Sequence, residues 1–279
     1  MKRKRYQRIS KEDKEKIKCL VLKGKSLREI SKILDVGITT IYYNTRKFRP
    51  RRKEKFVANL TEEKLGELMG AFAGDGSYYV SKHGRSSHHK VRYSLSLSKD
   101  LAYSEYLIDL LKNLKLNPFL IKNVKGGAIE VLVNSKDYSE FIRKFLSWEN
   151  KKTYSVRLKH ELASYDDKFL IGFARGLMDT DGFVEVSNVS CGCVSEQLIK
   201  NLGRIFDRFG IRYKMSRKIR EPKRKDLFLV RVYRESLKDY FGLIGFSNRY
   251  KFDALNKILE GRWGRQDLNL RREVPNLES

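Results

Sequence analysis

One stretch of this sequence occurs twice, and it constrains the fold more than any other feature. Residues 65–76 (LGELMGAFAGDG) and residues 171–182 (IGFARGLMDTDG) align at a single offset (171 − 65 = 106). In each stretch apolar residues recur at steps of three and four, which is the pattern of an amphipathic helix. Both stretches nevertheless carry glycines four residues apart, and a glycine inside a helix costs about 1 kcal/mol relative to alanine. The repeat therefore predicts two helices whose glycines serve packing.

The glycine spacing indicates how the two helices pack. Residues four apart lie on one face of a helix, so Gly66 and Gly70 form a bare stripe on the first helix, and Gly172 and Gly176 form one on the second. Bare stripes let two helix backbones approach closely, as small residues do between membrane helices. We therefore expect the two helices to pack in parallel about a pseudo-twofold axis. The alternative is a pair of glycine-rich core helices in some other duplicated fold.

An aspartate stands at the same place in both repeats. Asp75 precedes Gly76 and Asp181 precedes Gly182, and each glycine suits a left-handed turn that ends a helix. Parallel packing would bring the two carboxylates side by side at helix C-termini, where the helix dipole is negative. Like charges are unfavourable there unless cations bind, and hard oxygen ligands favour Mg²⁺ or Ca²⁺. The pair therefore predicts a divalent-metal centre of the kind that cleaves phosphodiester bonds.

At these residues the sequence resembles the LAGLIDADG homing endonucleases. The resemblance rests on residues 68–76 and 174–182 and covers the chain from about residue 57 to residue 262. It implies a monomer that binds double-stranded DNA at a long, specific target and cuts both strands, leaving short 3′ overhangs. It also implies Mg²⁺ as the cofactor, with Mn²⁺ or Ca²⁺ able to substitute for binding. The metal contacts that it implies are Asp75, Gly74, Asp181 and Thr180.

The family also places a basic residue near each catalytic aspartate. In this sequence Lys151 or Lys152 fits the first centre, and Arg249 or Lys251 fits the second. The alternative for each of them is a surface residue with no part in catalysis. Asp179 is also close to the second centre in sequence, but it falls off the helical register of the aspartates, so we expect it to be structural.

The charge balance points to a polyanionic partner. The 279 residues include 60 Lys and Arg and 34 Asp and Glu, a net charge of +26. This excess favours nucleic acid, and no apolar run reaches the ~18 residues that a membrane-spanning helix needs. No secretory signal is visible, and Cys19, Cys191 and Cys193 are expected to be reduced. We therefore expect an intracellular, cytoplasmic protein of prokaryotic or organellar origin.

The N-terminal residues predict a small helical DNA-binding domain. Ser10 and Ser26 each begin a helix with an acidic residue three positions later, and a third helix follows from Ile38 to about Lys47. Residues 26–42 resemble the helix-turn-helix of resolvase and invertase recombinases and of many regulators.

That resemblance implies DNA contacts from the third helix, with Ile38 and Ile41 as its anchors. Base edges would be contacted by Thr39, Thr40, Tyr43 and Asn44, and phosphates by Arg46 and Lys47. Residues 1–55 carry 20 Lys or Arg against 6 acidic residues, or +14 of the total charge. The alternative is therefore a helical cap that only adds charge.

The remaining residues predict an α+β protein of two pseudo-symmetric halves. In each half the glycine helix is followed by two strands, a helix, two strands and a closing helix, an αββαββα order with a four-stranded antiparallel sheet. The resemblance implies that the two sheets form a DNA-binding saddle. The expected segments are a helix-turn-helix domain (1–48), a basic linker whose Arg51 and Arg52 follow a DNA groove (49–58), the first half (59–160), the second half (161–262) and a loose tail (263–279).

Basic and aromatic residues alternate with apolar residues along the predicted strands. Antiparallel strands in the major groove can read base edges directly, and the sheets of the resembling family lie there. A solvated charged face is the alternative. The expected DNA contacts are Tyr78, Lys82, Arg85, Lys90, Arg92 and Lys99 in the first half, and Arg212, Lys214, Arg217, Lys218, Arg220 and Arg231 in the second.

The predicted function is site-specific, metal-dependent hydrolysis of both strands of DNA, as in intron homing. A nuclease-inactive transcription regulator or an RNA-splicing maturase on the same fold is the alternative. The helix-turn-helix favours this alternative, whereas the presence of both Asp75 and Asp181 favours the nuclease, because an inactive site has no need of two destabilising carboxylates. The sequence leaves open an intron, intein or free-standing origin.

Overall fold

The computed structural model describes residues 9–46, 56–83, 86–221 and 225–270, without the side chains of residues 83, 86 and 262–270. The chain divides into two compact units, with the division after residue 54. The predicted DNA contacts Lys47, Arg51, Arg52 and Arg85 lie outside the described residues. No helix among the described residues is both long and apolar enough to cross a bilayer.

The described part of the first unit is made of helices: α1 (Lys11–Leu22), α2 (Leu27–Leu34) and α3 (Ile38–Thr45). The predicted caps begin the first two, because Ser10 Oγ accepts from Asp13 N at 3.0 Å and Ser26 forms a reciprocal capping box with Glu29. Asp35, with φ = 47°, makes the left-handed turn between α2 and α3. The core of the unit consists of Ile17, Val21, Ile30 and Ile41.

The second unit begins with a half in the predicted order. Its elements are α4 (Glu62–Asp75), β1 (Gly76–His83), β2 (Ser86–Ser96), α5 (Leu101–Asn113), β3 (Phe119–Asn123), β4 (Ala128–Asn134) and α6 (Lys136–Phe145). The sheet is antiparallel with the order β1-β2-β4-β3. A short connection follows through β5 (Leu146–Ser147), α7 (Lys152–Ser155), β6 (Arg157–Leu158) and the 3₁₀ turn η1 (Leu162–Ser164).

The other half repeats this order. Its elements are α8 (Asp167–Thr180), β7 (Gly182–Val184), β8 (Val189–Cys193), α9 (Glu196–Arg208), β9 (Tyr213–Lys218), β10 (Leu227–Val232), the 3₁₀ turn η2 (Arg234–Ser236), α10 (Leu237–Leu243) and α11 (Arg249–Leu270). The sheet order is β7-β8-β10-β9, again antiparallel. The predicted fold class, with a four-stranded antiparallel sheet in each half, is confirmed.

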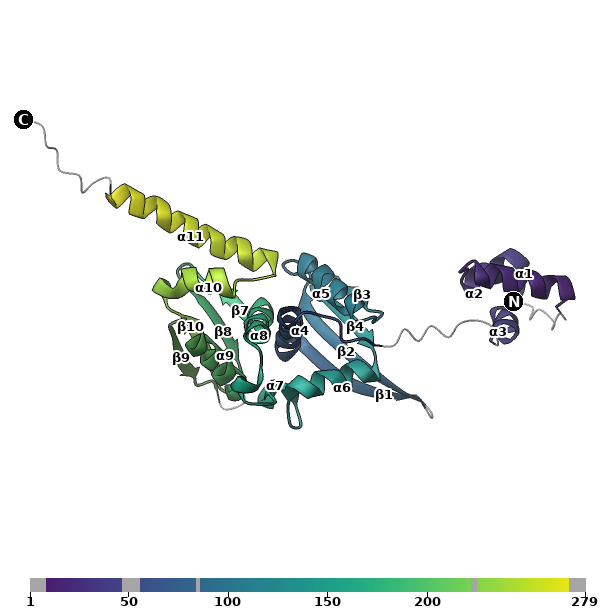
Figure 1. The fold of residues 1–279 in the computed structure, drawn as a ribbon, viewed down its shortest axis with the longest axis horizontal. Coiled ribbons are helices and arrows are strands. Elements are labelled where there is room, and N and C mark those ends of the chain that lie inside the picture. The colour runs from purple at the N-terminus through teal and green to yellow at the C-terminus, as the bar shows by residue number, and fades with distance from the viewer. Residues whose placement is uncertain (1–8, 47–55, 84–85, 222–224, 271–279) are drawn as a thin grey trace, which may run out of the picture. The chain divides into compact units, whose positions relative to one another are not determined.

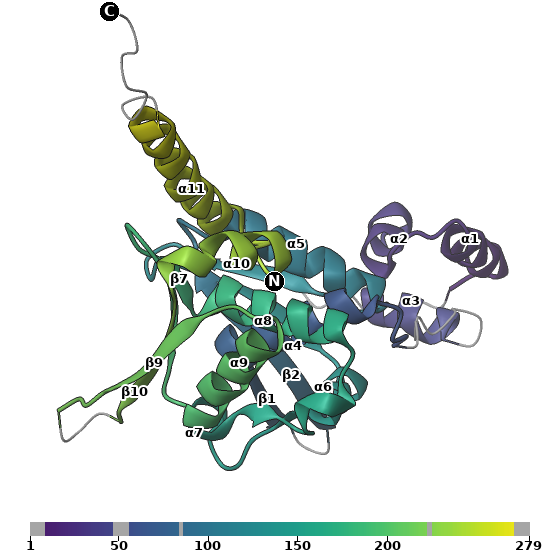
Figure 2. The same ribbon diagram turned by 60° about the vertical axis from the view of Figure 1, so that its left-hand side comes forward.

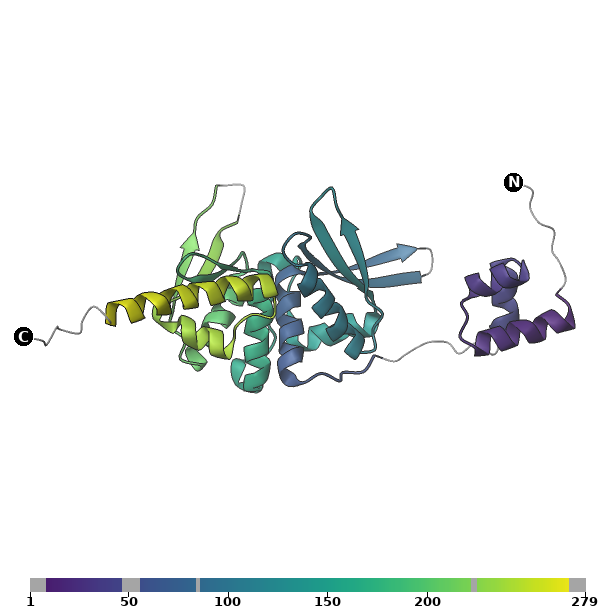
Figure 3. The same cartoon turned by 90° about the horizontal axis from the view of Figure 1, so that it is seen from above.

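Helices α4 and α8 lie side by side at the centre of this unit (Figure 1). One sheet lies on each side of the helix pair (Figure 3). Helices α5 and α6 cover one face of the first sheet, and α9 covers one face of the second (Figure 2). In β2 every second residue, namely Val91, Tyr93 and Leu95, is buried in the core on the side of these helices. The alternate residues face outward.

Two sequence predictions about the backbone are wrong. Gly76 does not end its helix with a left-handed turn, since its φ is −74° and it starts β1 directly. Gly182 is not among the residues with positive φ either. The closing helix continues past the predicted start of the tail at residue 263, and α11 reaches Leu270, so part of the expected tail is helical. Extending a formed helix gains one hydrogen bond per residue, and it needs no apolar periodicity.

Candidate functional site

The glycine stripes of α4 and α8 bring the two backbones into contact. A methyl group on Gly70 would overlap the carbonyl oxygen of Phe173 and lie 2.7 Å from Leu177 N. Reciprocally, a methyl group on Gly176 would overlap Glu67 O and lie 2.8 Å from Ala71 N. One turn earlier, the same relation holds for Gly66 and Gly172. The glycines therefore fix the distance and the register of the two helices.

This register brings the ends of the helices together. A methyl group on Gly74 would lie 3.3 Å from Cγ of Asp181, so that carboxyl lies against the last turn of α4. Burial, together with the negative charge of Asp181, raises the pKa of Asp75 to about 7. Burial also raises the pKa of Asp181 to about 6. The two carboxylates thus share a site in which ionisation is costly.

A lysine closes the end of each central helix in the same way. Lys152 Nζ donates to the carbonyl oxygens of Phe72, Ala73 and Gly74 at 2.8, 2.6 and 2.7 Å. Lys251 Nζ donates to those of Met178, Asp179 and Thr180 at 3.1, 2.6 and 2.9 Å. An ammonium group has three donors, so all of them are used. Each positive charge also opposes the negative end of a helix dipole.

The positive charges of Lys152 and Lys251 act on both aspartates, because each of them lowers the pKa of Asp75 and of Asp181. Burial lowers the pKa of Lys152 to about 8, although Asp181 and Asp75 act in the opposite direction. Burial likewise lowers the pKa of Lys251, against the opposing charge of Asp179 and other carboxylates. Of the predicted basic residues, therefore, Lys152 and Lys251 belong to the centre.

Lys151 and Arg249 do not belong to it. Lys151 is the exposed residue before α7. Arg249 has an 83% exposed side chain and pairs with Asp253 at 3.8 Å. The position of each residue relative to the centre is set by the start of a helix, because Lys151 precedes the first residue of α7 and Arg249 is the first residue of α11.

Asp179 lies in the protein interior, where its side chain is hydrogen-bonded to residues 247 and 248. It is 1% exposed, and its carboxylate accepts from the backbone N–H groups of Ser247 and Asn248 at 3.2 and 2.9 Å. Burial raises its pKa to about 8. Asn248 Nδ2 also donates to Asp100 Oδ1 at 2.7 Å, which links the second half to the first.

The donor set at the helix ends consists of hard oxygen atoms. Among the described residues no group of three or more His, Cys, Asp or Glu could hold a metal ion. Mg²⁺, however, is commonly held by one or two carboxylates while it keeps several waters. Burial raises the pKa of both Asp75 and Asp181, and a bound cation would offset the cost of ionising them. The carbonyls of Gly74 and Thr180 already accept from lysine, and each retains one lone pair.

The register of the sheets decides which predicted DNA contacts face outward. Lys90 and Arg92 lie on the face of the first sheet away from its covering helices, because the buried Val91 and Tyr93 point the other way. On the second sheet Val230 is buried, so its neighbour Arg231 faces outward. Lys214 and Lys218 face outward too, because they lie on the same side of the sheet as Arg231. Three predicted contacts lie beyond the ends of strands. Lys99 and Arg212 are exposed there, and Arg220 is half-buried.

Three other predicted contacts do not lie on these outward faces. Tyr78 and Lys82 share the side of Tyr93, and Tyr78 packs against the core with its hydroxyl 2.8 Å from His89 Nδ1. Arg217 is on the side of Val230, where it pairs with Asp226 and lies over the Phe228 ring. Tyr79, which sequence reasoning missed, occupies the outward position beside Lys90 and Arg92.

In the first unit, α3 presents a mixed face to solvent. Of the predicted contacts, Thr39, Tyr43 and Arg46 are exposed, whereas Thr40 and Asn44 are half-buried and the Asn44 amide donates to Thr40 O at 2.8 Å. Two neighbouring positions differ from the prediction. Ile38 is 46% exposed and does not anchor the helix, and Tyr42 is 52% exposed on the face that Tyr43 also occupies.

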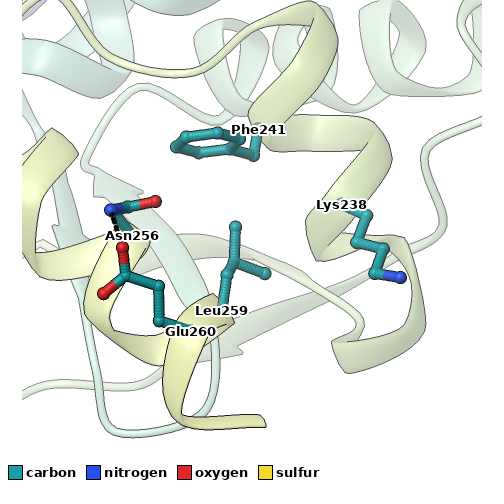
Figure 4. A pocket seen from close by; sticks show the side chains of 5 residues that line it. All are labelled: Lys238, Phe241, Asn256, Leu259 and Glu260. Carbon is teal, nitrogen blue, oxygen red and sulfur yellow. Dashed lines mark hydrogen bonds between the residues drawn. The ribbon is translucent and has the colours of Figure 1, made fainter. Parts of the chain in front are cut away.

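A separate hollow lies between α10 and α11 (Figure 4). It is lined by Lys238, Phe241, Asn256, Leu259 and Glu260. Asn256 Nδ2 donates to Glu260 Oε1 at 2.6 Å within it. None of these residues belongs to the aspartate centre.

Comparison with known proteins defines the class of this fold. The family described as LAGLIDADG-like domain matches residues 168–245, which include the second repeat. The crystal structure of I-DmoI in complex with DNA and Ca covers 70% of this chain and 98% of that chain at 16% identity, with a TM-score of 0.53. The second unit therefore has the LAGLIDADG fold.

Two curated relatives from Methanocaldococcus jannaschii extend the likeness. The chain is 28% identical over 200 residues to a replication factor C small subunit, an alignment that covers 71% of this chain and 10% of that protein. It is 24% identical over 271 residues to an uncharacterized protein, covering 88% of this chain and 92% of that one. The chain thus spans about a tenth of the length of the replication protein.

Proposed function

We propose that this chain is a site-specific endonuclease that uses a divalent metal to cut both strands of duplex DNA, acting as a monomer with one active centre per strand. One observation carries the proposal. Two equivalent carboxylates, Asp75 and Asp181, stand at the ends of two helices in backbone contact, although burial makes the ionisation of both costly and the charge of Asp181 adds to the cost at Asp75. A protein that only bound DNA would gain from an amide at either position.

The residues of the centre have distinct roles in this proposal. Asp75 and Asp181 would hold Mg²⁺ ions near the two scissile phosphates. A bound divalent metal supplies Lewis-acid activation of water and stabilisation of the leaving oxygen. Lys152 and Lys251 hold the last turns of α4 and α8, and so they orient the two aspartates. Their positive charges also favour the ionised form of both carboxylates.

The duplex would lie across the outward faces of both sheets. These faces carry the cations Lys90, Arg92, Lys214, Lys218 and Arg231. Antiparallel strands fit the major groove. The exposed polar and aromatic residues on α3 and at its end, namely Thr39, Tyr42, Tyr43 and Arg46, would enter a further major groove in the manner of a helix-turn-helix.

The test needs the DNA target. Duplexes that bind full-length protein in a chelator are selected from a genomic fragment library and cloned into a plasmid. Incubation with Mg²⁺ should convert that plasmid to the linear form with a staggered cut, whereas chelator, or a plasmid without the insert, should leave it intact. Binding to the insert with no strand cleavage in Mg²⁺ or Mn²⁺ would refute the nuclease.

A second candidate function is sequence-specific DNA binding without cleavage, as in a transcription regulator, or RNA binding as in a splicing maturase. Its support is that Lys152 and Lys251 already satisfy the carbonyls at both helix ends, so the centre is closed without metal. The plasmid test separates this candidate from the nuclease. A protein that selects a duplex but never nicks it is a binding protein.

A further inference from the structure

The first outward row of residues beyond the catalytic aspartates is arranged in parallel on the two sheets. Ser77 and Phe183 each stand two residues after their aspartate. Across the first sheet the row runs Ser77, Arg92, Leu132 and Phe119. Across the second it runs Phe183, Ser190, Arg231 and Lys214. Each row thus contains one arginine beside one serine.

Both arginines are held by the same pair of partner types. Arg92 Nε donates to Ser77 Oγ at 3.2 Å, and its Nη1 donates to Glu130 Oε1 at 3.2 Å. Arg231 Nε donates to Ser190 Oγ at 3.3 Å, and its Nη2 pairs with Glu185 Oε2 at 3.3 Å. We call these two groups the Arg92 triad and the Arg231 triad.

Stability alone does not account for building this arrangement twice. Both ion pairs are partly open to solvent, with side-chain exposures of 37% and 27% for Arg92 and Glu130 and 53% and 40% for Arg231 and Glu185. Pairs of this kind add little to stability. The serines and carboxylates do, however, fix the planes of the guanidinium groups. Three of the five guanidinium N–H donors remain free of these partners in each triad.

The free atoms match one base pair. Guanine presents two acceptors in the major groove, O6 and N7, which suit the donors of an arginine, and cytosine presents an N4 donor, which suits a glutamate. A fixed arginine beside a carboxylate is therefore complementary to G·C. An adenine–thymine pair would place the N6 donor of adenine against the arginine donors, or the methyl group of thymine against the charged groups.

The triads are not related by the symmetry of the fold. Arg92 belongs to the second strand in the order of its sheet, whereas Arg231 belongs to the third in its own. Neighbouring strands are about 4.8 Å apart, and base pairs are about 3.4 Å apart along the duplex. On a duplex that runs across the strands of both sheets, this offset of one strand would place the two arginines at distances from the centre of the target that differ by about one base-pair step.

We propose that the Arg92 and Arg231 triads each select a G·C base pair, one in each half-site, and that these pairs lie at unequal distances from the centre of the target. The inference rests on the proposed DNA-binding role of the outward faces. It does not need cleavage, and so it can fail or succeed separately from the nuclease.

The experiment is a binding selection with full-length protein on a randomised duplex library, without divalent cations. Wild type should enrich one G·C pair in each half-site. Arg92→Gln should lose the preference at one position and Arg231→Gln at the other, by roughly tenfold to hundredfold. Glu130→Gln and Glu185→Gln should each weaken the same preference as the arginine they hold.

Two further variants separate base reading from other roles. Arg92→Lys keeps the charge, so it should keep the salt dependence of binding, while it weakens the G·C preference because an ammonium group lacks the planar fork that the serine and the glutamate hold in place. Arg157→Gln is the matched control, because Arg157 also has 37% exposure and a glutamate partner, Glu149, at 3.2 Å, but lies in the β5–β6 ribbon. It should leave both preferences unchanged.

The inference is overturned if Arg92→Gln and Arg231→Gln retain the wild-type base preferences, if both alter the same position, or if wild type selects no sequence. Selection that depends on the triads, in a protein that never cuts, refutes the nuclease alone. Cleavage at a target whose preferences ignore the triads refutes this inference alone. A melting curve of each variant shows whether it is folded.

Discussion

Gly70→Ala tests the contact between the central helices, because it adds one methyl group where two backbones meet. That methyl group would overlap Phe173 O and lie 2.7 Å from Leu177 N. Neither atom belongs to a side chain that can rotate away, so α4 and α8 must separate or shift. Overpacking of this kind costs about 1–3 kcal/mol, and it outweighs the gain of about 1 kcal/mol from helix propensity.

The expected change is large enough to measure by thermal unfolding. For a unit of about this size, 1 kcal/mol corresponds to a shift in Tm of about 2–4 °C. Because the overlapped atoms are backbone, we expect a cost at the upper end of the range for overpacking, about 2–3 kcal/mol. Subtracting about 1 kcal/mol for helix propensity leaves a net loss of about 1–2 kcal/mol, which predicts a Tm lower by roughly 2–8 °C. Gly176→Ala should behave similarly, because its methyl group would overlap Glu67 O.

Gly261→Ala is the matched control. Gly261 also lies inside a helix, α11, but no atom is within 4 Å of an added methyl group. This variant should leave the Tm unchanged or raise it slightly, since only helix propensity changes. If Gly70→Ala also leaves the Tm unchanged or raises it, the two helices are not in backbone contact and the account of the repeat is wrong.

Three more predictions concern the charges. The pKa of Asp75 is raised to about 7 from an ordinary value of 3.8, so the folded protein keeps a proton that the unfolded chain releases, and metal-free stability should fall as pH rises from about 4 to about 7. Asp75→Asn should remove the Asp75 share of this slope in unfolding measured against pH, while the raised pKa values of Asp179 and Asp181 keep the rest; a variant with the full wild-type slope would contradict the burial of the Asp75 charge. Lys152→Met should lower the free energy of unfolding by about 1–3 kcal/mol, because it leaves the carbonyl groups of α4 without donors, whereas Lys151→Met should have no effect in the same denaturant titration; equal losses would refute the cap. Deleting residues 1–55 should weaken DNA binding and reduce the slope of log affinity against log salt by about 0.9 for each phosphate that this segment neutralises, and an unchanged slope in a salt titration would mean that the segment does not touch DNA.

The central helix pair could be predicted from the sequence because its signal is a repeat. A glycine every fourth residue has few physical meanings, and the constant offset aligned Asp75 with Asp181. The caps of α1 and α2 were also predictable, since Ser10 and Ser26 act through residues three positions away. Such local rules do not depend on the tertiary fold.

The side of the sheet to which an individual residue points was less predictable. β1 contains adjacent tyrosines, Tyr78 and Tyr79, and period-two alternation alone does not say which of the two is outward. Only pairing with Val91 and Tyr93 of β2 sets that parity. Arg217 and Lys218 are a clearer case, because adjacent strand residues cannot both face the same side.

The choice among basic residues near the centre depended on where helices begin. Lys151 and Lys152 are neighbours in sequence, yet only Lys152 reaches the carbonyls of α4. The partners of the outward arginines were also missed, since Glu130 and Glu185 come from other strands or loops. A lone carboxylate on an otherwise apolar strand, Glu130 in β4, was the signal that could have found the first of them.

The most direct test of the central claim is cleavage of the selected target by aspartate variants. Asp75→Asn and Asp181→Asn should each abolish double-strand cleavage of the plasmid in Mg²⁺ while DNA binding persists. Asp109→Asn, which changes a 72% exposed carboxylate on α5, should cut like wild type. Linear product from Asp75→Asn or Asp181→Asn at the wild-type rate would contradict the proposal that this carboxylate pair is the catalytic centre.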